Sequence, residues 1–185
     1  MEISDLVDSK IRAFSFKIEA AVYHKHKMQL ILSGHEDKFL AVAKDATFPA
    51  PKKIRPFFFH YDAFLFELVS CFDIILHIVR IKNSLPLKEE ETSWNKKFKW
   101  LLQQNNRKAY ELLEKKWNEW WFEDLRNARN YITHNDRLSL GIEVRNNGDN
   151  LFFFALPKMH ERREIFEHCT IWIKEMRFFD TFFRL

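Results

Sequence analysis

Glycine and proline are scarce in this sequence of 185 residues, with only 3 Gly and 5 Pro. Both residue types mark tight turns, so their scarcity argues against a β-sandwich and against a glycine-rich phosphate-binding loop. Cysteine is scarcer still. Cys71 and Cys169 lie within apolar helical patterns, and we expect them to be small buried side chains in a reducing compartment. Helices are therefore the expected way to organise this chain.

We expect neither a secretory leader nor a membrane span. Residues 1–5 lack a basic segment, and no apolar core follows them. The most apolar stretch, residues 57–81, is interrupted by ionisable side chains such as Asp62, Glu67 and Arg80, which a bilayer interior would not tolerate. The expected location is the cytoplasm.

Aromatic residues are abundant, with 20 Phe and 6 Trp among the 16% of the chain that is aromatic. They bury large apolar areas, so this length suffices for one domain over residues 1–185. We expect an N-terminal helix and connector, residues 1–50, to pack on a bundle formed by residues 55–185. The net charge of +4 permits nucleic-acid binding without demanding it.

Apolar residues recur at three- and four-residue steps along much of the chain, which predicts amphipathic helices. Residues 55–81 are apolar nearly all round, which is typical of a buried central helix. In a helix over residues 108–133 we expect Trp117 and Trp121 to be core residues rather than a base-stacking platform. The remaining predictions for the first two thirds of the chain are a helix over 4–27, an extended piece at 28–33, a short helix at 37–45, a connector marked by Pro49, Pro51 and Pro56, an exposed loop at 82–92 and a short helix at 94–102.

A small β-hairpin is predicted before the last helix. Ile142–Arg145 and Leu151–Ala155 are β-prone runs, and the Asn-Gly between them is a strong hairpin signal. Pro157 suits the first turn of a last helix that runs to about Phe182. The expected fold class is mainly all-α: an antiparallel helical bundle with the hairpin inserted before its last helix.

The end of the predicted helix over residues 108–133 carries the sequence Arg-Asn-Tyr-Ile-Thr-His, from Arg129 to His134. An imidazole with a pKa near 6.5 can take a proton from the 2′-hydroxyl of RNA or protonate the leaving 5′-oxygen. A guanidinium can bind two phosphate oxygens and stabilise the charge that builds on phosphorus. Asn130 could orient the phosphate. Such chemistry needs no metal or other cofactor and yields a 2′,3′-cyclic phosphate.

This segment resembles the Arg-x4-6-His motif of the HEPN superfamily, in which Asn often follows the Arg near the end of a helix. The resemblance implies a helical bundle, a homodimer with a composite site, and a metal-independent endoribonuclease with a toxin or defence role. It also implies RNA as the partner, and an antitoxin or a nucleotidyltransferase-type protein as a further partner. The alternative is a non-catalytic HEPN-like module that binds RNA, a nucleotide or a protein.

The spacing alone is weakly specific, since Arg55 with His60 and Arg163 with His168 show it too. A third interpretation is that Arg129 and His134 only cap a helix end. The two lie about 140° apart on a continuous helix. They can meet if the helix loosens near Thr133, if the Arg129 stem wraps round, or if two chains each contribute one of them.

Further residues are candidates for supporting roles. Arg126 is an alternative phosphate-binding residue, and the resemblance implies an acidic partner for the motif arginine, with Glu67 and Asp73 as candidates. Both acids belong to a polar stripe that faces either solvent or a cleft or dimer seam. The stripe consists of His60, Glu67, Ser70, Asp73, His77 and Arg80.

Two other clusters suggest weaker functional hypotheses. His24, His26 and His35 are expected to be surface histidines rather than metal ligands. A basic cluster near Trp94, Trp100 and Tyr110 suits either an RNA path or, more simply, a solvated helix face. Its cations are Lys96, Lys97, Lys99, Arg107 and Lys108.

Overall fold

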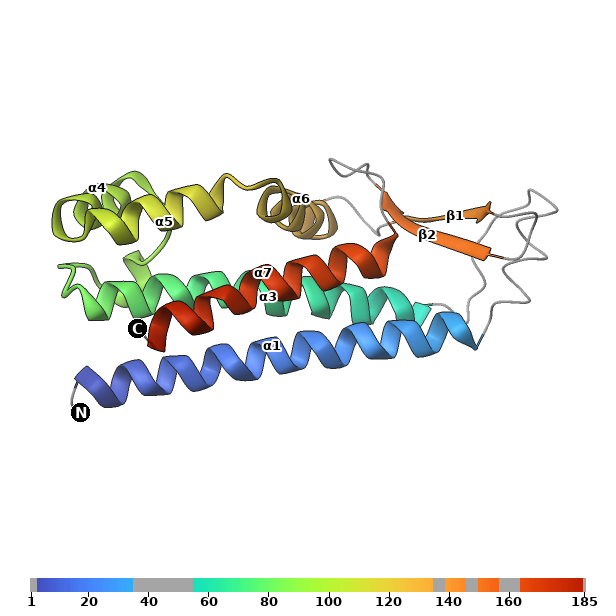
Figure 1. Ribbon diagram of the computed structural model, residues 1–185, viewed down its shortest axis with the longest axis horizontal. Coiled ribbons are helices and arrows are strands. Elements are labelled where there is room, and N and C mark those ends of the chain that lie inside the picture. Colours follow the sequence, from blue (N-terminus) through green and yellow to red (C-terminus); the bar gives the residue numbers. More distant parts are fainter. Residues whose placement is uncertain (1–2, 35–54, 135–138, 146–149, 157–163, 185) are drawn as a thin grey trace.

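The structure of the protein, a computed structural model, is mostly helical (Figure 1). It describes residues 3–34, 55–134, 139–145, 150–156 and 164–184. The predicted helical bundle is confirmed. The helices are α1 (Ile3–Ser33), α3 (Arg55–Lys82), α4 (Lys96–Asn105), α5 (Arg107–Trp117), α6 (Trp120–His134) and α7 (Ile165–Arg184), with a 3-10 turn at Glu89–Glu91.

Helix α1 is longer than predicted. Its buried face repeats every seven residues through Val7, Phe14, Ala21 and Met28, and Leu32 is also buried. The extended piece expected at residues 28–33 is therefore wrong, because these residues continue the same apolar face and hence the helix. The short helix at 37–45 and the connector with Pro49 and Pro51 lie outside the described residues.

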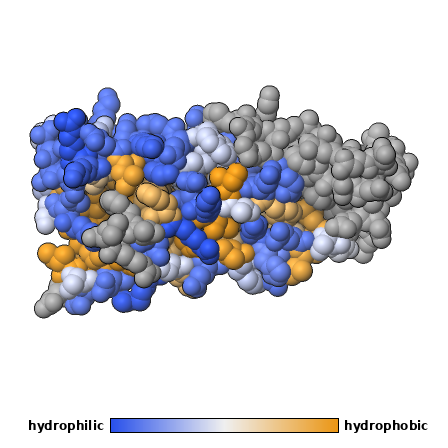
Figure 2. Space-filling model, in the orientation of Figure 1, coloured by the Kyte–Doolittle hydropathy of each residue, from blue (hydrophilic) through white to orange (hydrophobic). Residues whose placement is uncertain are grey.

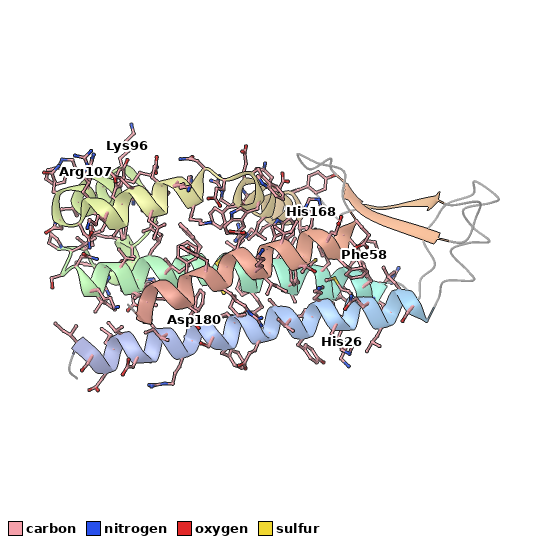
Figure 3. The ribbon with its side chains drawn as sticks, in the orientation of Figure 1. His26, Phe58, Lys96, Arg107, His168 and Asp180 are labelled. Atoms are coloured by element: carbon pink, nitrogen blue, oxygen red, sulfur yellow. The ribbon has the colours of Figure 1, made fainter. Side chains whose placement is uncertain are left out.

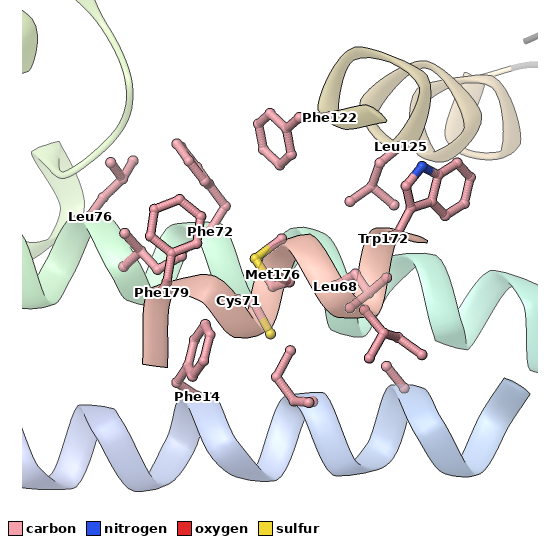
Figure 4. Packing of buried hydrophobic residues seen from close by; sticks show 14 of the residues in the cluster. Phe14, Leu68, Cys71, Phe72, Leu76, Phe122, Leu125, Trp172, Met176 and Phe179 are labelled. Atoms are coloured by element: carbon pink, nitrogen blue, oxygen red, sulfur yellow. The ribbon is translucent and has the colours of Figure 1, made fainter. Parts of the chain in front are cut away.

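Helix α3 is the predicted central helix, and it runs antiparallel to α1 (Figure 1). Phe64 stacks on Trp172 of α7 with ring centroids 6.3 Å apart, and Phe72 lies 4.6 Å from Phe122 of α6. Figure 4 shows Phe72 among side chains from the surrounding helices. One face of α3 contacts α1, while others contact α6 and α7, which explains why its sequence is apolar nearly all round.

The predicted helix over residues 108–133 is in fact two helices, α5 and α6, separated at Asn118 and Glu119. The backbone N–H of Asn118 donates to the Glu114 carbonyl at the end of α5, and the Glu119 carbonyl accepts hydrogen bonds from the N–H groups of Phe122 and Glu123 in α6. The break lets Trp117 and Phe122 pack together with centroids 5.3 Å apart. Trp121 is buried, so the prediction of core tryptophans is confirmed.

Strands β1 (Ser139–Arg145) and β2 (Asn150–Leu156) follow α6 and pair antiparallel, with Gly141 opposite Phe154. Helix α7 begins at Ile165 and not at Pro157, which lies outside the described residues. The carboxylate of Glu164 accepts hydrogen bonds from the N–H groups of Phe166 and Glu167, and so caps the helix.

The two cysteines are buried and unpaired with each other, as predicted. Burial raises the pKa of both thiols, which keeps Cys71 and Cys169 protonated. No helix within the described parts of the chain is long and apolar enough to cross a bilayer.

Candidate functional site

The end of α6 carries the predicted Arg-His motif. Arg129 is half-buried, Asn130 is exposed, and the Nη1 of Arg129 donates to the Asn130 side-chain oxygen at 3.3 Å. His134 is the last residue of α6, and its side chain lies outside the described part of the chain. The helix continues through Thr133, so the backbone positions of Arg129 and His134 are about 140° apart around its axis. The loosening near Thr133 considered above is absent from the backbone.

Asp73 of α3 lies beside the motif. Partial burial of its carboxyl raises the pKa of Asp73, and the Arg129 guanidinium acts in the opposite direction and lowers it. The residue as a whole remains exposed, so the carboxylate and guanidinium lie at the rim of the α3–α6 contact. An acidic group from an earlier helix is thus close enough to the motif arginine for the two charges to interact.

Glu67, the other acidic candidate, faces a different helix. Its carboxylate is 2.7 Å from the Nζ of Lys17 on α1. Asp73 lies six positions after Glu67, so the two point about 120° apart around α3. Of the two acidic candidates, Asp73 is thus the one whose charge is coupled to Arg129.

Arg126 is half-buried against aromatic side chains. Its Cζ is 4.0 Å from the centre of the Trp117 ring and 5.3 Å from that of Phe122. Its Nη2 donates to the Trp117 carbonyl at 3.4 Å, and burial lowers the pKa of the guanidinium. The guanidinium thus bridges α6 and α5 by stacking on Trp117 and donating to its carbonyl, which is a packing role.

The histidines of the two rival Arg-His pairs are engaged in packing. His60 shares a hydrogen bond with His24, the two Nδ1 atoms being 2.9 Å apart. His168 is buried between α6 and α7, with its ring 5.5 Å from that of Trp172 (Figure 3). Arg163 lies outside the described residues. The His24–His60 pair was not predicted from the sequence. The antiparallel register of α1 and α3 that sets Lys17 opposite Glu67 also brings these two histidines together.

The His24–His60 geometry suits a hydrogen bond rather than a metal. The ring centroids are 5.2 Å apart, close to the nitrogen separation plus two ring radii, so the two nitrogens point at each other. To bind one metal ion, the lone pairs of the two nitrogens would have to point at a common position outside the N···N line, and not at each other. Among the residues that the structure describes, no group of three His, Cys, Asp or Glu side chains could hold a metal ion.

The basic cluster of α4 and α5 is largely ion-paired. Lys97 pairs with Glu91, Lys99 with Glu114 and Arg107 with Glu111, each at 2.8 Å. These acids offset the positive charge that an RNA path would need. Figure 2 shows this end of the molecule as mostly hydrophilic, in keeping with the interpretation as a solvated helix face.

Comparison with known proteins adds one match. The model of the Cthe2314-like HEPN family matches residues 11–174. The match includes most of α1 and the whole of the motif. No curated protein and no solved structure matches the chain significantly.

Proposed function

Because the chain belongs to the Cthe2314-like HEPN family, we propose that it is a metal-independent endoribonuclease that acts through Arg129, Asn130 and His134. The observation that carries the proposal is that Arg129 lies within electrostatic reach of the Asp73 carboxyl and beside exposed Asn130 near the end of α6. An acid that attracts the guanidinium from one side leaves its remaining N–H groups available to a phosphate. Neighbouring Asn130 adds a neutral donor for the same group.

The chemistry assigns one task to each side chain. The imidazole of His134 takes the proton from the 2′-hydroxyl or delivers one to the 5′-oxygen that leaves. Arg129 stabilises the negative charge that builds on the phosphoryl oxygens, and Asn130 orients the scissile phosphate. The products are a 2′,3′-cyclic phosphate and a 5′-hydroxyl.

Two chains are proposed to complete one site. Within one chain, Arg129 and His134 occupy helical positions about 140° apart, which disfavours a shared phosphate. In a two-fold dimer the motif of one chain faces that of its partner, so Arg129 of one can act with His134 of the other. RNA is the proposed substrate.

The test is cleavage of a mixed RNA by the purified chain in excess chelator, followed by analysis of the new ends. We expect 2′,3′-cyclic phosphate ends with wild type and none with His134→Ala. The matched control is His26→Ala, because His26 is exposed on α1 and points away from the bundle (Figure 3). Binding of RNA with equal absence of cleavage in all three proteins would favour the non-catalytic module instead.

A further inference from the structure

One basic residue in the polar seam between α1 and α3 takes its acidic partner from outside both helices. Lys17 of α1 lies 2.7 Å from the Glu67 carboxylate of α3. Seven residues earlier in α1, the same antiparallel register sets Lys10 opposite Ile74, which carries no charge. The Nζ of Lys10 instead lies 2.7 Å from the carboxylate of Glu89, in the 3-10 turn that follows α3. Lys10 therefore takes its counter-charge from a loop and not from the helix on which it packs.

Two side chains at the end of α3 join Lys10 around the same carboxylate. The start of α1 and the end of α3 lie at one end of the bundle (Figure 1), and His77 and Arg80 of α3 both interact electrostatically with Glu89. The Nη1 of Arg80 also donates to the Leu87 carbonyl at 2.9 Å, which holds the guanidinium against the loop. We call Lys10, His77 and Arg80 the donor cluster.

The donor cluster has more donors than acceptors. The Nδ1 of His77 and the Nε of Arg80 are buried without a hydrogen-bond partner in the described part of the chain. The charged groups that act on the His77 imidazole are Lys10, Glu89 and Arg80, so two cations face one carboxylate. The ion pairs of α4 and α5 show no such surplus, because each of their cations has its own acid.

The carboxylate is the most exposed member of this group. The Glu89 side chain has 62% of its surface exposed, against 26% for Lys10, while His77 and Arg80 are half-buried. Ion pairs as exposed as this one are only weakly stabilising, so another anion can displace Glu89. A phosphate offers more acceptor oxygens than a carboxylate and suits Lys and Arg donors.

The donor cluster shares a face of α3 with the acid near the proposed catalytic motif. Asp73, His77 and Arg80 follow at steps of four and three residues, within about 60° around the helix axis. Asp73 interacts electrostatically with Arg129. Asp73 and Arg80 are about 10 Å apart along α3 at 1.5 Å per residue, which about three nucleotides span at 3.4 Å each. A strand whose scissile phosphate lies at Arg129 can therefore present a nearby phosphate to the donor cluster.

We propose that the donor cluster is a phosphate subsite, at which a backbone phosphate of the RNA strand displaces the carboxylate of Glu89. Glu89 is then a competitor built into the chain, and it weakens the binding of RNA. The subsite positions the strand and takes no part in breaking bonds. That the phosphate belongs to RNA rests on the proposed function, whereas the affinity of the donor cluster for phosphate does not.

The first test measures the binding of a fluorescent single-stranded RNA by anisotropy. Its 2′-hydroxyls are methylated, so the strand lacks its nucleophile and stays intact. We expect Glu89→Gln to bind at least about 3-fold more tightly than wild type, because the competing charge is gone. Lys10→Gln should bind at least about 3-fold more weakly, with a salt dependence reduced by about one phosphate contact.

Matched controls change the same charge at a neighbouring position. Glu90→Gln removes another exposed carboxylate of the same 3-10 turn, and Arg12→Gln removes an exposed cation about 200° around α1 from Lys10. Both controls should change the affinity by less than about 1.5-fold. Equal affinities of Glu89→Gln and Glu90→Gln, or of Lys10→Gln and Arg12→Gln, would overturn the assignment to RNA.

The second test uses inorganic phosphate and needs no RNA. The imidazole C–H signals of His77, assigned by NMR with His77→Gln, are titrated against pH in the Glu89→Gln protein. Burial, Lys10 and Arg80 lower the pKa of His77, and a phosphate bound beside it should raise that pKa. Chloride at the same ionic strength should not, and an equal pKa in phosphate and in chloride would overturn the subsite.

The two tests separate the subsite from the proposed function. A phosphate-dependent pKa of His77, in a protein that neither binds nor cleaves RNA, would keep the phosphate subsite and reject the proposed function. Cleavage of RNA by wild type, with equal affinities within both matched pairs, would keep the proposed function and reject the subsite.

Discussion

The Nδ1 atoms of His24 and His60 lie 2.9 Å apart and point at each other across the seam between α1 and α3. An N–H···N bond of this kind exists when one ring is neutral and accepts, so the pair holds no more than one extra proton. Burial lowers the pKa of both histidines. Their mutual repulsion lowers the pKa of His24 further, and Lys27 lowers that of His60, while Glu67 raises that of His24.

The first prediction is that stability falls in mild acid. With the pKa lower in the folded than in the unfolded chain, the unfolded state binds more protons as the pH drops below the ordinary histidine value of about 6.5. The stabilising contribution is therefore present above that value and is lost as the pH falls through the folded pKa. Thermal unfolding followed over this range should show the decline.

The control for this prediction is a pair of variants. His24→Gln should flatten the pH dependence of the melting temperature, while His26→Gln, which changes an exposed residue of the same helix, should leave it as in wild type. A slope unchanged by His24→Gln would mean that other groups, such as half-buried His77, account for the acid sensitivity.

The second prediction separates Arg126 from Arg129. Arg126→Ala removes a guanidinium stacked 4.0 Å from Trp117 and should lower the free energy of unfolding by about 1–2 kcal/mol. Cleavage of RNA by the folded variant should persist. Arg129→Ala should do the opposite, with cleavage abolished and stability nearly unchanged. Urea unfolding and the RNA assay on the same samples measure both quantities, and loss of cleavage in a fully folded Arg126→Ala protein would restore Arg126 as a phosphate-binding residue.

The third prediction concerns Asp73 as a positioning residue. Asp73→Asn removes the charge that faces Arg129 and should lower kcat for RNA cleavage roughly 10- to 100-fold, because a displaced guanidinium no longer fits the transition state. Asp62→Asn changes an exposed carboxylate on the same helix and serves as the control.

Three readouts keep this test specific. The melting temperature of Asp73→Asn should stay close to that of wild type, the effect should fall on kcat rather than KM, and Asp73→Glu should restore part of the activity. Equal activity of Asp73→Asn and Asp62→Asn would show that the acid does not orient Arg129 for catalysis.

The spacing of apolar residues along the sequence predicted the central helix and the position of the motif, but it did not predict the residues at which helices end. Residues 55–81 are apolar on every side, which only a central helix satisfies, and α3 spans nearly that range. The break at Asn118 was missed because the apolar stripe passes from Trp117 to Trp121 without interruption. Capping by Asn118 and Glu119 depends on hydrogen bonds that periodicity does not contain.

The candidate site could be predicted in part for a similar reason. The sequence identified Arg129, Asn130 and His134, but it could not choose between Glu67 and Asp73, since that choice depends on how α1 and α6 lie against α3. The register of α1 against α3 pairs Lys17 with Glu67. Asp73 then interacts electrostatically with Arg129 of α6. The stacking of Arg126 on Trp117 likewise follows from the turn between α5 and α6.

The last prediction tests the start of α7. Glu164 Oε2 accepts hydrogen bonds from the N–H groups of Phe166 at 2.7 Å and Glu167 at 3.1 Å. Glu164→Ala should lower the free energy of unfolding by about 1 kcal/mol, because two N–H groups of the first turn lose their acceptor. Lys174→Ala, an exposed position in the middle of α7, should be neutral or slightly stabilising in the same urea titration. If the two variants unfold alike, the Glu164 carboxylate does not stabilise the start of α7.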